Sequence, residues 1–519
     1  MIKKIRYRSF LLIVGYLFSV ACLGMESTKD PLLTPGVSRE LAKFRKTNYH
    51  HIRYELFFSL PEQRTQPVNG QVTIRLDMAY PHPVILDFRP EDQLLFCEVN
   101  GRELSSGTTG EHLFIPADYI QRGENSIEIS FIPSDQSLNR REELMYTLLV
   151  PDRARTLFPC FDQPDLKSLY TLSLEVPATW KAISNSPVMT EERHSSGRNV
   201  IRFRQTEPLS TYLFSFVAGE FTEETYQRGG ERKITIYHRE TDPKKVAQCP
   251  EIASEVFDAL EWLEAYTQIP YPFAKYDLII LPGFQYGGME HTGATLYNDR
   301  RMFLNESPTL DERLGRSALV AHETAHMWFG DYVTMEWFDD VWTKEVFANY
   351  FASLIVEPLY PDVNHRLNFI QGYIPGTYAE DRTSGSNSVK QELDNLANAG
   401  LVYGNIIYNK SPVVMEMLVQ MIGKENFKKG IQEYLDEYAY GNADWSGLIR
   451  ILDSYTPIDL QTWSQAWIYE KGMPEVKVKK ENGHWMITQE DPFDRGLVWP
   501  QLLSYQVYTE KEKKCSRWI

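Results

Sequence analysis

Residues 317–357, SALVAHETAHMWFGDYVTMEWFDDVWTKEVFANYFASLIVE, constrain the fold of this chain more than any other segment. His322 and His326 stand four apart in a run of helical periodicity, so both imidazoles project from one helix face. Two nitrogens do not complete a zinc site, and Glu345 in the next helical stretch is the candidate third ligand. The turn-like residues around Gly330 and 339–340 predict a chain reversal that packs the second helix beside the first.

The number of ligands predicts what this metal does. Three protein ligands leave the fourth position of one zinc ion to water, which is the arrangement of a catalytic site rather than a structural one. Glu323, next to His322, would flank that water, where a carboxylate can accept a proton during attack on a carbonyl and pass it to the leaving amine. The alternative is a surface helix with solvated histidines, which the apolar neighbours Val320 and Trp328 disfavour.

Composition limits the classes of partner. With 519 residues, of which 43% are hydrophobic and 24% charged, the chain is expected to form two or three folded domains. The 54 basic and 70 acidic residues give a net charge of −16, which disfavours nucleic acid or an anionic membrane surface as the main partner. An acidic cleft that binds cationic groups is compatible with this charge.

The hydrophobic pattern changes along the chain. Apolar and polar residues alternate at 70–78, 125–132 and 170–176, which predicts strands, and the polar segment 219–233 is a candidate boundary. After it, helices are predicted at 244–267, 309–329, 343–357 and 411–438, with strands at 233–238 and 276–281. The fold class is therefore multidomain, with a β-rich N-terminal domain (40–232) followed by an α+β domain (233–470).

The last part of the chain has a hairpin signal. PEVKVKK and HWMITQ flank Glu-Asn-Gly, so a partial β region is expected over 471–519. Fewer than fifty residues are too few for an independently stable sandwich, so the chain is either truncated here or ends in a packed appendage.

The first residues are typical of export. Four cations precede an apolar run from Phe10 to Gly24, so 1–24 is interpreted as a secretory signal, and the run is too short for a permanent membrane span. Cys22 follows Ser-Val-Ala, which resembles a bacterial lipoprotein cleavage site. The expected location is the periplasm or cell envelope, and lipid anchoring at Cys22 and simple secretion both stay open. No other contact with a membrane is expected.

Several segments together resemble the M1 family of zinc metallo-aminopeptidases, the aminopeptidase N group. They are H-E-x-x-H followed by eighteen residues and Glu, and FPCFDQPDLK (158–167), LPGFQYGGMEHTGATLYN (281–298) and VYGNIIYNKSPVVMEML (402–418), in family order. The similarity covers roughly residues 45–480. It implies a β-rich domain followed by a thermolysin-like catalytic domain, one zinc ion per chain and peptide substrates with a free N-terminus.

The resemblance also implies residue roles. Glu290 would pair with the substrate's α-ammonium, and Tyr408 would donate a hydrogen bond to the developing oxyanion. Tyr286 and Tyr403 would flank the first side chain of the substrate. The glycines of the segment Gly287-Gly288-Met289 would let an extended substrate backbone approach closely. Peptides with a blocked N-terminus are expected to be rejected.

Two departures from the family pattern bear on substrate binding. In much of the family, a pair of polar residues supplies a second group that binds the substrate's amine, but Leu148 and Val150 stand at those two places here. No carboxylate is then available there unless Asp152 supplies one. The second departure is His291, which stands where Asn is frequent. We expect weaker substrate binding with the catalytic groups intact. The alternatives are a catalytically impaired binding protein on the same fold, a thermolysin-type endopeptidase and a lipid epoxide hydrolase. Oligomeric state and the preferred first residue are not predictable from the sequence.

Overall fold

The computed structural model describes residues 31–518 except 91–92, 106–107, 195–196, 231 and 509–512. The predicted signal at 1–24, with Cys22, lies outside this range. Within it, no helix combines the length and apolarity that crossing a bilayer requires.

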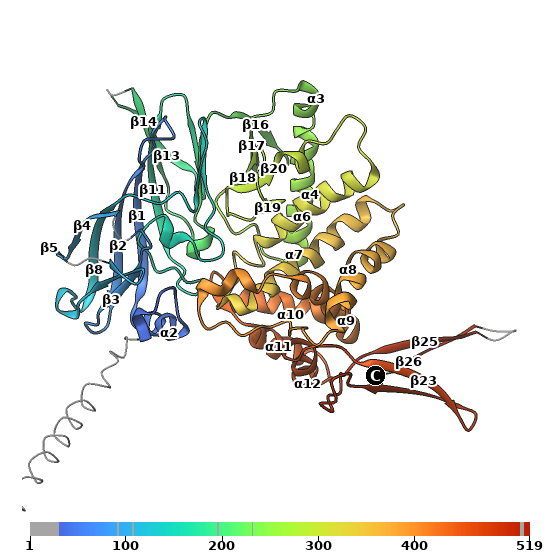
Figure 1. Ribbon diagram of the computed structural model, residues 1–519. Coiled ribbons are helices and arrows are strands. Elements are labelled where there is room, and N and C mark those ends of the chain that lie inside the picture. Colours follow the sequence, from blue (N-terminus) through green and yellow to red (C-terminus); the bar gives the residue numbers. More distant parts are fainter. Residues whose placement is uncertain are drawn as a thin grey trace, which may run out of the picture.

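The N-terminal part of the chain is built from β-sheets, as the alternating pattern predicts (Figure 1). The predicted strands at 70–78, 125–132 and 170–176 are β2, β8 and β11, which join one eight-stranded sheet. In spatial order this sheet contains β13 (Val188–Arg193), β14 (Arg198–Phe203), β11 (Leu169–Pro177), β1 (His50–Ser59), β2 (Asn69–Met78), β8 (Gly123–Phe131), β4 (Leu94–Val99) and β5 (Arg102–Glu103).

Two smaller sheets and a helix complete this region. The four-stranded sheet has the order β12 (Lys181–Ser184), β15 (Phe216–Gly219), β10 (Leu144–Thr147) and β9 (Leu138–Arg140). The three-stranded sheet consists of β3 (Val84–Asp87), β7 (His112–Ile115) and β6 (Thr108–Thr109), and helix α2 spans Arg39–Asn48. The ring of Phe58 lies 5.9 Å from Phe131 and 5.2 Å from Phe216, so the core joins the eight- and four-stranded sheets.

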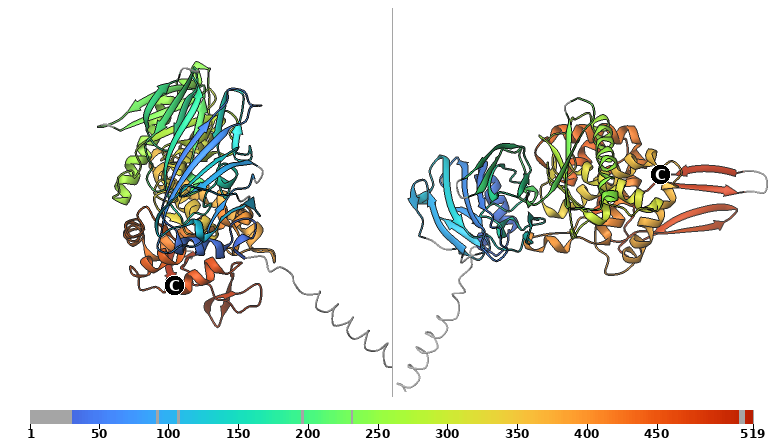
Figure 2. Two further views of the ribbon diagram at one scale, coloured as in Figure 1. Left: turned by 90° about the vertical axis from the view of Figure 1, so that its left-hand side faces the viewer. Right: turned by 90° about the horizontal axis from the view of Figure 1, so that it is seen from above.

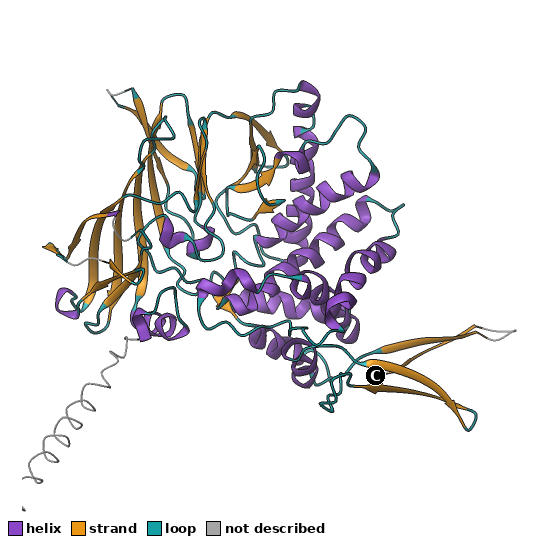
Figure 3. Cartoon of the chain, viewed as in Figure 1, coloured by secondary structure: helices purple, strands orange, loops and turns teal. Residues whose placement is uncertain are grey.

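The second region combines a five-stranded sheet with helices (Figure 3). Its strands, in order, are β16 (Thr222–Gln227), β17 (Lys233–His238), β18 (Tyr276–Leu281), β20 (Thr295–Asn298) and β19 (Gly288–Met289). The helices are α3 (Pro243–Val246), α4 (Cys249–Thr267), α5 (Asp299–Met302), α6 (Leu310–His326), α7 (Val341–Val356), α8 (His365–Asp381), α9 (Ser411–Ile422), α10 (Lys424–Glu437), α11 (Trp445–Asp453) and α12 (Leu460–Ser464). A short parallel pair, β21 (Thr334–Met335) and β22 (Asn442–Ala443), links the helical segments. The predicted fold class, a β-rich part followed by an α+β part, is confirmed.

Two local expectations need correction. The single helix expected at 411–438 is two helices, because Gly423 between them has a φ of 83°. The helix expected at 244–267 is interrupted between α3 and α4. The polar segment 219–233, the candidate boundary, contains β16, which is an edge strand of the five-stranded sheet. The domain boundary at 233 stays a prediction.

The C-terminal part contains two hairpins, which agrees with the expected β region. They are formed by β23 (Glu475–Glu481) with β24 (His484–Glu490), and β25 (Leu503–Tyr508) with β26 (Lys513–Trp518). Figure 2 shows the hairpins beyond the helical region, at the end opposite the N-terminal sheets. The linking segment is anchored by the buried Trp499 and by the Trp467 indole, which donates to the Pro500 carbonyl at 2.7 Å.

Candidate metal centre and active site

Two adjacent helices carry the predicted metal ligands. Helix α6 starts at a capping box, in which Thr309 Oγ1 accepts from the Glu312 amide and Glu312 accepts from the Thr309 amide. It ends at His326, after which Gly330 adopts a φ of 135°. Helix α7 then returns beside α6 (Figure 1). The reversal that the turn residues predicted places Glu345 opposite both histidines.

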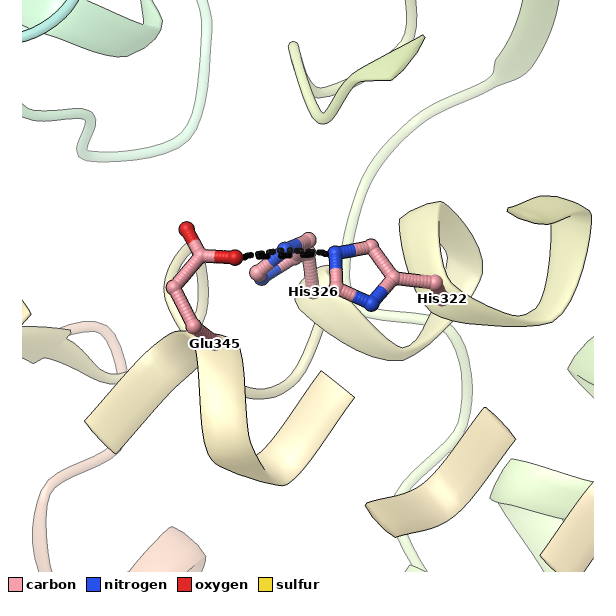
Figure 4. A group of neighbouring side chains, drawn as sticks. All are labelled: His322, His326 and Glu345. Carbon is pink, nitrogen blue, oxygen red and sulfur yellow. Dashed lines mark hydrogen bonds and ion pairs between the residues drawn. The ribbon is translucent and has the colours of Figure 1, made fainter. Parts of the chain in front are cut away.

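The donor atoms of these three side chains converge (Figure 4). The Nε2 atoms of His322 and His326 lie 3.0 Å apart, and Glu345 Oε2 lies 3.7 and 4.0 Å from them. All three donors lie within 4.8 Å of one another. Two nitrogens bound to one tetrahedral zinc at about 2.05 Å would be separated by about 3.3 Å, so the spacing fits a shared ion.

Hydrogen bonds behind the rings fix which nitrogen faces inward. His322 Nδ1 lies 3.1 Å from Asn349 Oδ1, and His326 Nδ1 lies 3.1 Å from the Phe329 carbonyl oxygen. Both partners are acceptors, so each Nδ1 carries the proton and each Nε2 keeps its lone pair toward Glu345. Burial and the neighbouring His326 lower the pKa of His322 to about 4, so its imidazole is neutral at pH 7. These residues fit a zinc ion.

Glu323 lies on the same face of α6 and is buried. Burial, together with the carboxylates of Glu290 and Glu345, raises the pKa of Glu323 well above its ordinary value. Strand β19 passes close to it, because a Cβ at Gly288 would lie 2.3 Å from Glu323 Oε1. Glu323 therefore fills the space where a side chain at position 288 would lie, which explains why this residue is glycine. The sequence-based explanation was different, namely that glycine lets a substrate backbone approach closely.

Glu290 has a partner that the sequence interpretation missed. Lys344 Nζ donates a hydrogen bond to Glu290 Oε1 and lies 3.3 Å from Glu345 Oε1. Burial alone would raise the pKa of Glu290, but the Lys344 ammonium holds it well below its ordinary value. In return, the two carboxylates outweigh burial and raise the pKa of Lys344. A signal was present, since this lysine stands in a helix otherwise rich in apolar residues.

The predicted aromatic residues surround the same space. The rings of Tyr403 and Tyr408 stack with centroids 6.3 Å apart, and Tyr408 lies in a π-helical turn, η9 (Ile406–Lys410). Tyr408 is 40% exposed and Tyr286 is 47% exposed, so both are accessible to a ligand. Burial, followed by the Glu345 carboxylate, raises the pKa of Tyr408, which therefore keeps its proton at neutral pH.

A cavity of about 760 Å³ brings these groups together. It is lined by every residue that the sequence singled out for a role: Tyr286, Gly287, Gly288, Met289, Glu290, His322, Glu323, His326, Glu345, Tyr403 and Tyr408. Val150 also lines it, whereas Leu148 is buried in the core. Asp152 borders a different cavity and binds Arg155 at 2.7 Å, so it does not supply a second group for an amine.

Comparisons with known proteins point to one peptidase family. The Peptidase family M1 domain model matches residues 253–467, and the Peptidase M1 N-terminal domain model matches residues 130–213. Aminopeptidase M1-A of Oryza sativa subsp. japonica is 29% identical over 441 residues, covering 83% of this chain and 49% of its own length. Probable aminopeptidase 1 of Sulfurisphaera tokodaii is 31% identical over 65% of this chain and 42% of its own length.

A human relative extends the similarity to nearly the whole chain. Glutamyl aminopeptidase of Homo sapiens is 27% identical over 96% of this chain and 51% of its own length. The chain therefore spans about half the length of the curated relatives it matches. With two matching family models in family order and the donor set between two helices, the chain belongs to peptidase family M1.

Proposed function

We propose that the protein is a zinc-dependent aminopeptidase that hydrolyses the first peptide bond of peptides. The observation that carries the proposal is the convergence of His322, His326 and Glu345 beside the buried Glu323 in one cavity. The names of the relatives, all aminopeptidases in the three comparisons given above, support the same reaction.

The residues divide the chemistry between them. A zinc ion held by His322, His326 and Glu345 would polarise the scissile carbonyl and lower the pKa of water. Glu323 takes the proton from the attacking water and passes it to the leaving amine, a task that its raised pKa favours. The Tyr408 hydroxyl donates to the carbonyl oxygen as negative charge develops there.

The position of cleavage requires recognition of the substrate's amino end. Glu290 lies in the same cavity and is ionised, which supports its proposed role beside the substrate's amino group. Tyr286 and Tyr403 offer aromatic surfaces for the first side chain.

We also propose that the protein is exported. The support is the charged start and apolar run within residues 1–24, and lipid anchoring at Cys22 remains the alternative to release. The mass of the mature N-terminal peptide decides between these, because an acylated cysteine at position 22 adds the mass of its lipid.

Glu323→Gln tests the reaction most sharply. The variant keeps the metal ligands and the side-chain volume but cannot accept a proton, so hydrolysis of aminoacyl chromogenic substrates should fall by about 10²–10⁴-fold. Zinc content, measured by elemental mass spectrometry, should be unchanged. Asp311→Asn, on an exposed position of the same helix, is the matched control and should keep wild-type activity. Near wild-type rates for Glu323→Gln would exclude the proposed base.

A further inference from the structure

The cavity has a direction, which strand β19 and helix α6 define together. The two elements contact each other, and their flanking residues meet in ascending order. A Cβ at Gly287 would lie 3.3 Å from Leu319 Cδ1. Three residues further along each segment, Glu290 and His326 have ligand atoms within 4.8 Å of each other. Glu290 therefore marks one end of the cavity, and Gly287 points toward the other.

Helix α6 measures the length of this cavity. It contributes lining residues from Gly315 to His326, and the metal donors lie at the end near Glu290. From His322 back to Gly315 the helix rises about 10 Å, at 1.5 Å per residue. An extended peptide rises about 3.3 Å per residue, so about three substrate residues fit along α6 beyond the metal donors. With the substrate's amino group at Glu290, these are the residues that follow the first peptide bond.

The end of the cavity away from Glu290 carries a cation. Arg301 lines the cavity and belongs to α5, which contacts α6. Asn298 fixes the start of α5, because its amide donates to the Gly287 carbonyl at 2.9 Å and its Oδ1 accepts from the Arg300 amide at 2.9 Å. Arg301 is exposed, and within the described part of the chain no ion pair or side-chain hydrogen bond holds its guanidinium. Its donors are therefore free to bind a ligand.

We propose that Arg301 is a specificity-determining residue that binds a carboxylate on the third residue of the substrate. This inference rests on the proposed function, since it concerns the part of the peptide that follows the first peptide bond in the same cavity. The preferred substrates are peptides with a free amino end and an acidic group at the third position. That group is either the α-carboxylate of a tripeptide or the side chain of an acidic third residue.

The physical reason is the distribution of charge along the cavity. A guanidinium matches a carboxylate with two parallel N–H···O hydrogen bonds. Three lining carboxylates, Glu290, Glu323 and Glu345, gather around the metal donors, so a substrate carboxylate is repelled there and attracted at the Arg301 end. Because Arg301 is exposed, salt screens this attraction, and its effect on substrate preference is a modest one.

Two matched pairs of peptides separate the sources of the carboxylate. Leu-Ala-Ala is compared with Leu-Ala-Ala-amide, and Leu-Ala-Glu-amide with Leu-Ala-Gln-amide, by kcat/KM for cleavage of the first peptide bond by the zinc-loaded full chain. We expect the acidic member of at least one pair to be preferred by about threefold or more at low salt, and the preference to shrink at high salt. Preference in the first pair alone identifies the chain end, and in the second alone the side chain. A ratio below about threefold in both pairs overturns the proposal.

Arg301→Gln tests the assigned residue. The variant keeps a polar side chain but loses the charge, so the preference should fall to a ratio of about one or below, while kcat for the two uncharged peptides stays at its wild-type value. Arg300→Gln, at the exposed neighbour that is absent from the described cavity lining, is the matched control and should keep the preference. Arg153 is the other arginine that lines this cavity. Loss of the preference in Arg153→Gln but not in Arg301→Gln overturns the assignment.

Failure of the proposed function gives a different result. If the wild-type protein cleaves none of the four peptides, the aminopeptidase proposal fails, and calorimetric titration of the same two pairs then decides the inference. Tighter binding of an acidic member by about threefold or more, lost in Arg301→Gln, supports the role of Arg301, and equal dissociation constants within both pairs overturn it. If Arg301→Gln does not fold, the wild-type ratios and their dependence on salt decide.

Discussion

Two clusters of buried charged side chains lie in different parts of the molecule, and they are completed in different ways. In the β-rich part, Arg45 binds both carboxylate oxygens of Asp87, at 2.8 and 2.6 Å, and donates to the Ile85 carbonyl. His112 Nδ1 and the Asp162 amide also contact Asp87. Burial would raise the pKa of Asp87, but Arg45 and His112 hold it below its ordinary value. This cluster is satisfied from within the chain.

The cluster at the cavity of about 760 Å³ is different. Among the described residues that line this cavity, three buried carboxylates, Glu290, Glu323 and Glu345, face a single buried cation, Lys344. Two imidazole nitrogens also point into it with their lone pairs free. Buried carboxylates and imidazole lone pairs without a partner lower the stability of the folded state unless a bound cation pairs with them. The first cluster balances its buried charges with groups of the chain itself, whereas the second has excess negative charge and open donors that could hold a cation.

The largest effect is expected from unbalancing the first cluster. Arg45→Met leaves Asp87 buried without its guanidinium partner, so the free energy of unfolding should fall by about 3–5 kcal/mol. Urea unfolding followed by fluorescence measures this. Arg75→Met removes an exposed pair with Glu55 and should cost less than about 1 kcal/mol. The folded fraction of Arg45→Met should keep its kcat. Equal stability of the two variants would mean that the Arg45 pair is not what stabilises this region.

A smaller effect is expected from a neighbouring carboxyl group. Burial is the main reason that the pKa of Asp162 is raised from 3.8 to about 7, and the folded protein therefore keeps a proton that the unfolded chain loses. Its stability contribution is complete below pH 4 and is lost as pH rises from 4 through 7, by up to about 1.4 kcal/mol per pH unit.

Asp162→Asn removes this dependence while keeping the partners. An amide oxygen can accept from the Arg155 amide, now at 3.0 Å, and its nitrogen can donate to Thr211 Oγ1, now at 2.9 Å. The stability advantage of the variant over wild type should therefore grow between pH 4 and 7. The exposed Asp118→Asn serves as the control. A constant difference across this pH range would show that Asp162 is ionised in the folded protein.

The smallest effect concerns the second cluster. Asn349→Ala removes the acceptor behind His322 without touching a metal donor, so zinc affinity should fall by about 10–100-fold. Competition with a fluorescent chelator measures the affinity. Ser353→Ala, on the same helix and outside the cavity lining, should bind zinc as wild type does. If both variants bind equally well, the orientation of His322 does not depend on Asn349.

Local patterns predicted much of the fold and of the donor set. Strands with alternating burial, such as 70–78, and the spacing of His322, His326 and Glu345 are encoded within short segments. The break at Gly423 was missed because the apolar periodicity continues through it. The ion pair between Glu290 and Lys344 joins residues 54 apart in the chain, and it forms only when the segment at β19 packs against α7. The lysine itself stands out in an apolar helix, but its partner is set by tertiary packing and could not be predicted from the local sequence.

The proposed metal centre requires one divalent cation to complete the second cluster. Zinc X-ray absorption spectroscopy of the purified protein, with metal content measured on the same sample, tests this directly. We predict one zinc per chain with two imidazole nitrogens at about 2.0–2.1 Å, an oxygen shell at about 2.0–2.2 Å and no sulfur, and loss of the imidazole signal in His326→Ala. A sulfur shell, or a zinc spectrum unchanged in His326→Ala, would contradict the assignment of this cavity as the metal centre.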